Sequence, residues 1–324
     1  MRKIYSVLIL AVAWIVAVQT FAEAAATSAP DVEVDAKVKA SVAEQIDPAK
    51  ELVSQVLDRY MGKTEISTLS LMTCPYQIKN KKLSCASDIR KKKVKSLTKN
   101  YGENLRDSKG LLLIVEPIAE FGIGILQYDY TNSGQDTDQW LYLPELDQVK
   151  RMSSSADAPK KGSLFGSEFA LEDVEREKVA DYEYRILKTA KIGGRDVTVV
   201  EQHPDDERAK KTNYLKRVKW IDSERLIVLK ENFYSLSGEL MKVSYVSNVE
   251  EIDGIWTARQ RTMRNLKSQR ISMLHYDDVN YNIEIDDEYL TRRVLSDAVY
   301  RNRFLNDIDE SVQKNSEAKL GMNP

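Results

Sequence analysis

The sequence predicts an α+β protein: a large, curved antiparallel sheet, in effect an incomplete β-barrel, covered by a few helices. One strong helical pattern stands near the start of the chain. Most of the remaining chain consists of short strand-like segments divided by turn signals such as Gly193-Gly194 and Ser237-Gly238. These segments form a meander of roughly ten strands, and an open sheet of that size usually curls, which leaves an inner apolar face that helices must cover.

The N-terminal residues have the layout of a secretory signal peptide. Arg2 and Lys3 precede an apolar run from Val7 to Val18, and Ala22-Glu23-Ala24 supplies small residues for cleavage. We therefore expect residues 1–24 to be removed. The run is shorter than the roughly 20 residues that a spanning helix needs, and no cysteine follows the cut for lipid attachment. The mature protein is expected to be soluble and periplasmic.

The sequence next predicts a lead-in segment and a helix. Residues 25–46 lack a clear period and predict a flexible lead-in. Asp47 can cap a helix with Pro48 at its first position, apolar residues share one face up to Tyr60, and Gly62 provides a stop.

Strands and further helices follow in order. We expect one domain over residues 47–305 and a polar C-terminal tail over 306–324. The helix at 48–60, a short helical piece near 167–174 and a segment around 288–304 are the expected covers of the inner face. The expected strands are 111–115, 124–130, 140–143, 149–152, 182–189, 195–202, 214–221, 226–233, 240–249, 256–263 and 270–276.

Composition and motifs argue against several classes of protein. The chain has 48 Lys and Arg against 50 Asp and Glu, so a generally basic nucleic-acid binder is not expected. Its two histidines stand in no metal-ligand spacing, and no nucleophile elbow or phosphate loop is present. The acid pairs occur in turn-like stretches and are interpreted as solvated loops; they are Asp205-Asp206, Asp277-Asp278 and Asp286-Asp287. We predict no enzyme, no metal and no cofactor.

The two cysteines, Cys74 and Cys85, are expected to form a disulfide, because export places them in an oxidising compartment. Free thiols are the alternative. A short loop closed in this way would stabilise the fold by about 2–3 kcal/mol.

A basic stretch surrounds the second cysteine. One interpretation is contact with an anionic surface, above all through Lys91, Lys92 and Lys93, and the other is a solvated strand edge protected by lysines. The stretch contains one acid, Asp88, among the cations Lys79, Lys81, Lys82, Arg90, Lys91, Lys92, Lys93, Lys95 and Lys99.

Two motifs carry a family resemblance. The first reads Trp140-Leu141-Tyr142-Leu143-Pro144 and leads into a basic strand through Arg151. The second reads Phe165-Gly166-Ser167-Glu168-Phe169 and ends in Glu172-Asp173-Val174, where Ser167 can cap a helix with an acidic first turn. Together they resemble the outer-membrane lipoprotein-sorting proteins of the LolA-like superfamily.

Further segments from about residue 48 to 305 fit the same pattern. They are Met72, Glu116-Pro117, Gly124-Ile125-Leu126, Gly193-Gly194, Trp220-Ile221-Asp222, Gly238 to Lys242 and Ile252-Asp253-Gly254. Residues 74–89 look like an insertion relative to the family.

The resemblance implies a LolA-like half-barrel that shields acyl chains of a lipoprotein or lipid. It also implies an inner-membrane transporter and an outer-membrane acceptor as partners, and we expect a monomer. The candidate cavity or lid residues are Trp140, Tyr142, Leu143, Phe165 and Phe169. Structural motif roles are expected for Pro144, Gly166, Ser167, Glu172 and Asp173, the last two by fixing backbone amides or pairing with Arg151.

Three functions remain open at this point. The first is a periplasmic carrier that moves acyl chains between membranes. The second is a binding or accessory protein of a membrane lipid exporter that does not itself transport. The third, which the absent catalytic motifs disfavour, is an enzyme.

Overall fold

The structure is a computed structural model that describes residues 47–80, 82–102, 104–152 and 162–321. The helices are α1 (Pro48–Asp58), α2 (Asp206–Ala209), α3 (Arg292–Ser296) and α4 (Ala298–Gly321). The 3₁₀ turns are η1 (Ile118–Glu120), η2 (Pro144–Leu146), η3 (Leu164–Gly166), η4 (Leu171–Val174), η5 (Val179–Asp181) and η6 (Asp287–Leu290). The strands are β1 (Thr64–Lys79), β2 (Lys82–Cys85), β3 (Arg90–Tyr101), β4 (Asp107–Glu116), β5 (Gly124–Asp129), β6 (Asp138–Leu143), β7 (Gln148–Met152), β8 (Tyr182–Ile192), β9 (Arg195–Pro204), β10 (Tyr214–Asp222), β11 (Ile227–Ser235), β12 (Leu240–Ile252), β13 (Ile255–Asn265) and β14 (Arg270–Tyr281).

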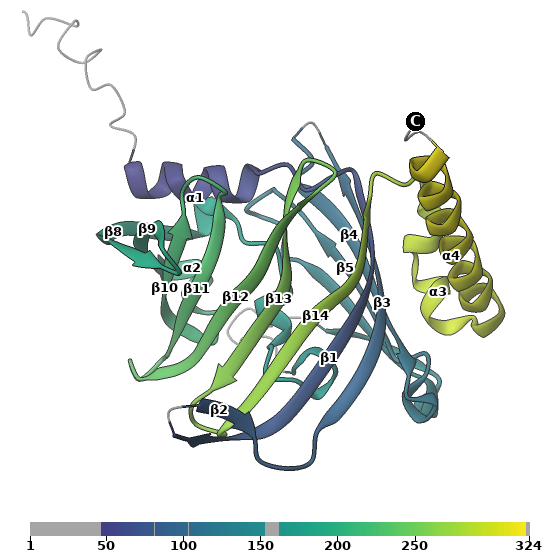
Figure 1. Cartoon of the computed structure of the whole chain (residues 1–324), viewed down its shortest axis with the longest axis horizontal. Helices are drawn as coiled ribbons and strands as arrows, with labels where there is room; N and C mark the ends of the chain where they lie inside the picture. Colours follow the sequence, from purple (N-terminus) through teal and green to yellow (C-terminus); the bar gives the residue numbers. More distant parts are fainter. Residues whose placement is uncertain (1–46, 81, 103, 153–161, 322–324) are drawn as a thin grey trace, which may run out of the picture. The chain divides into compact units, whose positions relative to one another are not determined.

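All described strands join one antiparallel sheet. Its order is β7-β6-β5-β4-β3-β1-β14-β13-β12-β11-β10-β9-β8, and β2 pairs with the end of β1. The sheet curls so that β10 and β11 face β4 and β5 across an interior (Figure 1). No pairing joins β7 to β8 among the described residues, so the barrel is open. The predicted fold class, a curved antiparallel sheet with a few helices, is confirmed.

Helix α1 forms where the sequence predicts it. The Asp47 carboxylate accepts a hydrogen bond from the Ala49 amide at 2.9 Å, and Pro48 occupies the first turn, where its missing amide proton costs nothing. Val53 and its neighbours pack against Tyr184 and Ile221 of the sheet. The helix therefore covers the inner face beside β8–β10, as expected.

Strands β4 and β5 are buried on both faces. Leu111 and Leu113 point to one side and pack with Leu126, while Leu112 and Ile114 point to the other. The unbroken run of aliphatic residues in β4 is typical of a strand covered twice. Each face of this part of the sheet therefore needs its own cover.

The C-terminal helices supply the outer cover. The expectation that the segment 288–304 covers the inner face is wrong, because its side chains pack on the outer face instead. Leu290, Leu295 and Phe304 are buried against the Leu111–Leu113 side of the sheet, and α3 and α4 stand outside β3–β5 (Figure 1). Residues 306–321, expected as a polar tail, continue α4, because Ile308 is fully buried in the same cluster.

Strands β1 and β3 complete the centre of the sheet. The interpretation of the lysine-rich stretch as a strand edge holds only for its first part. Among the described residues β2 pairs with β1 alone, whereas β3 pairs with β1 on one side and, from Lys93 onward, with β4 on the other. Lys95 and Lys99 point to the outer face, where they pair with Asp309 and Asp287. The predicted disulfide is present between Cys74 and Cys85, whose Cα atoms are 5.7 Å apart.

The predicted signal peptide and lead-in, residues 1–46, lie outside the described residues. The described residues belong to one compact unit. None of the described helices is long and apolar enough to cross a membrane.

The outer cover can be tested with a paired substitution in α4. Phe304→Ala should lower the free energy of unfolding by about 3–5 kcal/mol, because it opens a cavity between α4 and the sheet. Val299→Ala, near the start of the same helix and 83% exposed, should change it by less than about 0.5 kcal/mol. Urea denaturation measures both, and equal effects would contradict the packing.

Candidate functional site

A cavity of about 450 Å³ lies between the inner face of the sheet, helix α1 and the segment that follows β7. Its apolar wall comes from α1, β4, β5, β10 and β11, and Leu164 and Val174 contribute from the following segment. Ligand pockets of proteins typically measure about 300–1,000 Å³ and are mainly apolar. The cavity thus has the size and lining of a site for an apolar ligand. Its apolar residues are Val53, Val56, Leu57, Met61, Leu69, Leu111, Leu112, Ile125, Leu164, Val174, Ile221, Val228 and Leu274.

Small residues on the inner face keep the cavity open. Ser108 and Gly110 of β4 and Ser96 and Thr98 of β3 line it at positions where larger side chains would fill the space. A Cβ atom added at Gly110 would meet its nearest neighbours, Thr98 Oγ1 and Leu97 O, at 3.8 and 3.9 Å. These are ordinary contacts, so the backbone does not require glycine there. The absence of a side chain at Gly110 contributes room rather than conformational freedom.

Polar side chains line two parts of the cavity. The first part consists of Gln127, Asp129, Glu175, Arg176, Glu177 and Lys219. The second part, which we call the polar wall, comes from β1, β13 and β14. It consists of Glu65 of β1, Arg261 of β13 and Tyr276 of β14. Arg261 lies opposite Leu274 in the ladder, and Tyr276 is two residues further on the same face. Burial raises the pKa of Glu65, which favours its neutral form, and also raises the pKa of Tyr276.

Arg261 has weak partners within the protein. Its Nε lies 3.5 Å from Ser244 Oγ, its guanidinium lies 5.8 Å from the centre of the Phe169 ring, and it takes part in no ion pair among the described residues. An arginine at a largely apolar cavity ordinarily pairs with an anion. The polar wall therefore offers a cation to a ligand.

Residues 162–174, which we call the plug, close one end of the interior. Ser163 and Ala170 form a bridge, Phe165 and Gly166 turn the chain at positive φ, and Phe169 is fully buried. Ser167 does not cap a helix as expected. Its Oγ accepts a hydrogen bond from the Phe169 amide at 3.2 Å, and so stabilises the turn itself.

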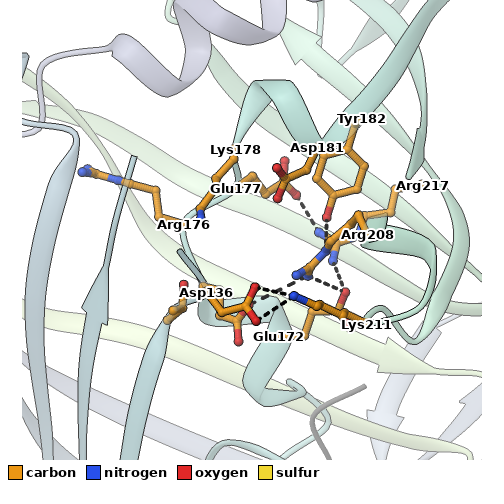
Figure 2. A pocket seen from close by; sticks show the side chains of 12 residues that line it. Asp136, Glu172, Arg176, Glu177, Lys178, Asp181, Tyr182, Arg208, Lys211 and Arg217 are labelled. Carbon is orange, nitrogen blue, oxygen red and sulfur yellow. Dashed lines mark hydrogen bonds and ion pairs between the residues drawn. The ribbon is translucent and has the colours of Figure 1, made fainter. Parts of the chain in front are cut away.

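The carboxylate of Glu172 anchors the plug to the sheet (Figure 2). It accepts hydrogen bonds from Arg208 at 2.9 Å, Arg217 at 3.3 Å and the Asn213 amide at 3.0 Å, and from the Thr212 hydroxyl. Burial raises the pKa of Glu172, but Arg217 and Arg208 outweigh burial, and the net pKa is lowered. The carboxylate is therefore ionised, and both of its oxygen atoms accept hydrogen bonds from the protein.

Asp173 makes a second anchor. It accepts hydrogen bonds from the Ala170 amide at 2.7 Å and the Tyr214 hydroxyl at 2.6 Å. The two acids thus bind backbone amides, as expected from the sequence, but neither pairs with Arg151. That arginine pairs with Asp138 across the β6–β7 hairpin.

Arg217, which binds Glu172, also belongs to a second group of buried charges. Arg217 and Lys219 both pair with Glu177, and each lies 3.8 Å from Glu231. Burial raises the pKa of Glu177, but Lys219 and Arg217 outweigh burial and bring it to about 2. Burial raises the pKa of Glu231, whose carboxylate lies farther from Arg217 and Lys219 than the carboxylate of Glu177 does.

The charged pocket in Figure 2 does not offer a second ligand site. Ten of its side chains are labelled there, and acids and bases pair with one another, for example Lys211 with Asp136 at 2.8 Å. Its free volume is about 30 Å³, enough for no more than a few water molecules. The cluster holds the plug and the sheet together.

The acid pairs and the two histidines make local contacts. Asp205 accepts from the Arg208 amide and Asp286 from the Glu288 amide, each at the start of a helical turn. His203 lies against Glu201, and His275 against Asp277. No cluster of potential metal ligands occurs among residues that the structure describes.

The predicted ligand residues fall in different places. Trp140 and Tyr142 point to the outer face, where they pack with the cluster under α3 and α4. Leu143 ends β6 beside Pro144, which starts the η2 turn. Phe165 and Phe169 belong to the plug, and Phe165 lines a smaller pocket beside Lys92. The lining of the large cavity includes none of the five; residues missed by sequence reasoning, such as Gly110 and Arg261, take that place.

The three lysines predicted to contact an anionic surface have different partners. Lys91 is exposed, Lys92 binds Glu120 and donates to the Phe165 carbonyl at 2.9 Å, and Lys93 lies 3.5 Å from Glu116. Lys92 therefore joins β3 to the plug through its hydrogen bond to the Phe165 carbonyl.

Comparisons with known proteins agree with this architecture. A family model described as "-like: Uncharacterized protein" matches residues 106–297. The crystal structure of a DUF1329 family protein from Desulfovibrio piger is 23% identical, with a TM-score of 0.67 over 76% of this chain and 97% of that one. A domain named as a candidate outer membrane lipoprotein-sorting protein from Vibrio parahaemolyticus is 27% identical, with a TM-score of 0.66 over 76% of this chain and 98% of that one.

A LolA superfamily protein from Nitrosomonas europaea shares the fold at 22% identity, with a TM-score of 0.55 over 76% of this chain and 98% of that one. No curated protein matches the sequence.

The buried charges predict a specific acid dependence. The pKa of Glu177 is lowered, so its contribution to stability is present above the unfolded value of about 4.3 and is lost as pH falls towards 2. Glu177→Gln should lower the free energy of unfolding at pH 7 by about 3 kcal/mol, and the difference from wild type should shrink in acid.

Glu231→Gln is the matched control. The pKa of Glu231 is raised, so its ionised form costs stability at pH 7, and the substitution should leave the free energy of unfolding unchanged or higher. Urea denaturation between pH 3 and 7 measures both variants. Parallel pH profiles for wild type and Glu177→Gln would refute the assignment.

Proposed function

The chain belongs to the LolA-like superfamily of outer-membrane lipoprotein-sorting proteins, and on this basis we propose that its cavity binds acyl chains of a lipid or lipoprotein. We further propose that the protein works in the periplasm and moves these chains between membranes. The single observation that carries the proposal is the apolar cavity of about 450 Å³ between the curled sheet, α1 and the plug.

The energetics explain why a carrier needs such a cavity. Exposing one 16-carbon chain to water costs on the order of 12 kcal/mol, at about 0.8 kcal/mol per methylene. Unassisted transfer through water is therefore slow. A shielded cavity lowers this cost, and small lining residues such as Gly110 and Ser108 leave it loosely filled, so that cargo can leave again.

The polar wall gives the cargo an orientation. We propose that Arg261 binds an anionic or carbonyl oxygen at the polar end of the chain, while the aliphatic part lies along the wall formed by α1, β4 and β5. Polar groups at fixed positions in a ligand pocket commonly determine the orientation of the ligand in this way.

The cavity can be filled by substitution. Gly110→Leu places an aliphatic side chain in the cavity and should weaken binding of a fluorescent fatty acid by about tenfold or more. Ser247→Leu adds the same side chain at an exposed position of β12 and should have no effect. Fluorescence titration measures both, and unchanged affinity in Gly110→Leu would place the ligand elsewhere.

Transfer is a separate measurement. Movement of a labelled lipid from donor to acceptor vesicles should require wild-type protein and fail with Gly110→Leu. Binding without any transfer would favour instead a stationary accessory protein of a lipid exporter.

The role of Arg261 predicts a dependence on the ligand head group. Arg261→Leu should weaken palmitate binding by about tenfold or more, because a charge-assisted hydrogen bond is lost. Binding of hexadecanol, which has the same chain without a charge, should change little. Arg264→Leu on the opposite face of β13 is the control and should affect neither ligand. Equal losses for palmitate and hexadecanol would show that Arg261 only supports packing.

A further inference from the structure

Several turns project from the same end of the sheet. β1 ends where β3 begins, Lys93 near the start of β3 lies opposite Glu116 at the end of β4, and Gly124 at the start of β5 lies opposite Tyr142 near the end of β6. The β1–β3 connection, the η1 turn and the η2 turn therefore lie side by side. We call this end the rim. It is the lower end in Figure 1, where β2 lies, and α1 lies at the other end.

Helix α4 also begins at the rim. A Cβ atom at Gly122, in the turn after η1, would contact the Arg301 guanidinium at 3.0 Å, which places the first turn of α4 beside that turn. Lys319 near the end of α4 pairs with Asp253 at the far end of the sheet. The helix thus runs from the rim to the opposite end.

The rim exposes large aliphatic side chains. Ile118 in η1 is 86% exposed and Val299 in α4 is 83% exposed. Each stands at the tip of a different turn or helix end. The exposed aliphatic residues of the rim include Ile78, Leu83, Ile89, Ile118, Leu146 and Val299, and Leu236 in the turn between β11 and β12 lies at the same end of the sheet.

One part of the rim is basic, whereas the η1 and η2 turns carry the acids Glu116, Glu120, Glu145 and Asp147. Residues 76–93, which we call the basic hairpin, carry Lys or Arg at seven positions and one acid, Asp88. Ile78 and Leu83 lie directly opposite each other in the β1–β2 ladder, and the Cys74–Cys85 disulfide holds its base. The described residues of the basic hairpin therefore present Ile78 and Leu83 together with the exposed cations Lys79, Arg90 and Lys91.

We propose that the rim docks on the surface of an anionic lipid bilayer. Neither aliphatic tips nor a basic patch alone gives stable attachment to a membrane, but the two together do. A bilayer fits better than a protein partner because the aliphatic side chains are divided among the basic hairpin, two turns and the start of α4. A fluid surface accepts separated tips, whereas a protein interface packs a contiguous patch.

Docking at the rim brings the membrane to the plug. Lys92 of the basic hairpin donates to the Phe165 carbonyl, and a pocket of about 320 Å³ lined by Arg90, Glu120 and Phe165 opens at this end. The plug therefore lies between the docked surface and the cavity. This inference goes beyond the proposed function, because it concerns attachment and holds whatever the cavity binds.

Co-sedimentation with vesicles tests the proposal. The purified protein should bind vesicles that contain phosphatidylglycerol, should bind pure phosphatidylcholine far less, and should be released by salt. Lys79→Glu/Arg90→Glu/Lys91→Glu spares the paired lysines 92 and 93 and should weaken binding by about a hundredfold or more. Ile78→Ser/Ile118→Ser should weaken it by about tenfold or more.

Matched controls come from outside the rim. Lys188→Glu/Lys191→Glu/Lys314→Glu makes the same change of charge, and Leu187→Ser/Leu320→Ser the same loss of exposed aliphatic residues. Both should bind as wild type does. Circular dichroism confirms that each variant is folded. Equal losses in rim and control variants, or no binding to anionic vesicles at low salt, would overturn the proposal.

A labelling experiment gives an independent readout. The two native cysteines are joined, so an introduced cysteine can be labelled selectively. A polarity-sensitive dye attached at Ile118→Cys should shift to the blue with anionic vesicles, and the same dye at Leu320→Cys should not. A shift only at position 320 would show that the opposite end docks.

Discussion

The buried carboxylate of Glu172 is the interaction on which the interior depends. It joins the plug to Arg208, Thr212, Asn213 and Arg217, which come from the segment between β9 and β10 and from β10 itself. Removing one partner of a buried ion pair is strongly destabilising, because it leaves an uncompensated buried charge. The network therefore fixes one position for the plug, and the plug in turn forms a wall of the cavity through Leu164 and Val174.

A second constraint is that the sheet is covered on both faces, and that the inner cover leaves a cavity beside the core that the plug forms with the sheet. On the outer face, Leu111, Leu113 and Leu126 meet Leu290, Leu295 and Phe304 in a continuous core. On the inner face, Gly110 and Ser108 leave space. The outer core can supply stability, so the inner face is free to keep a cavity. This division suits a protein that must hold a ligand loosely without losing its fold.

Much of the fold was predictable because it rests on local patterns. The α1 helix has its cap and proline in sequence, and most strands between 107 and 281 are bounded by turn residues that the structure uses as turns. The side of the sheet that each helix covers was not predictable. The apolar run in β4 indicates two covered faces, but nothing in it says which helix takes which face.

The site was less predictable than the fold. The family motif led to Trp140 and Tyr142, which pack under the C-terminal helices, whereas Gly110, Arg261 and Tyr276 line the cavity without belonging to any motif. The only sequence signal for Arg261 is that it is a charged residue in a predicted strand that has one face towards the interior. Its meaning depended on which strands lie opposite, and these are brought there by the curl.

The sequence by itself determined the antiparallel meander, the first helix, the pairing of Cys74 with Cys85 and the membership of the superfamily, because short-range patterns and motifs carry each of these. Only the tertiary structure decided where α4 packs, which residues surround the cavity, and that the basic hairpin shares an end with Ile118 and Val299. The physical reason is the curl of the sheet. It brings together side chains that are far apart along the chain, and no local pattern records which strands will face each other.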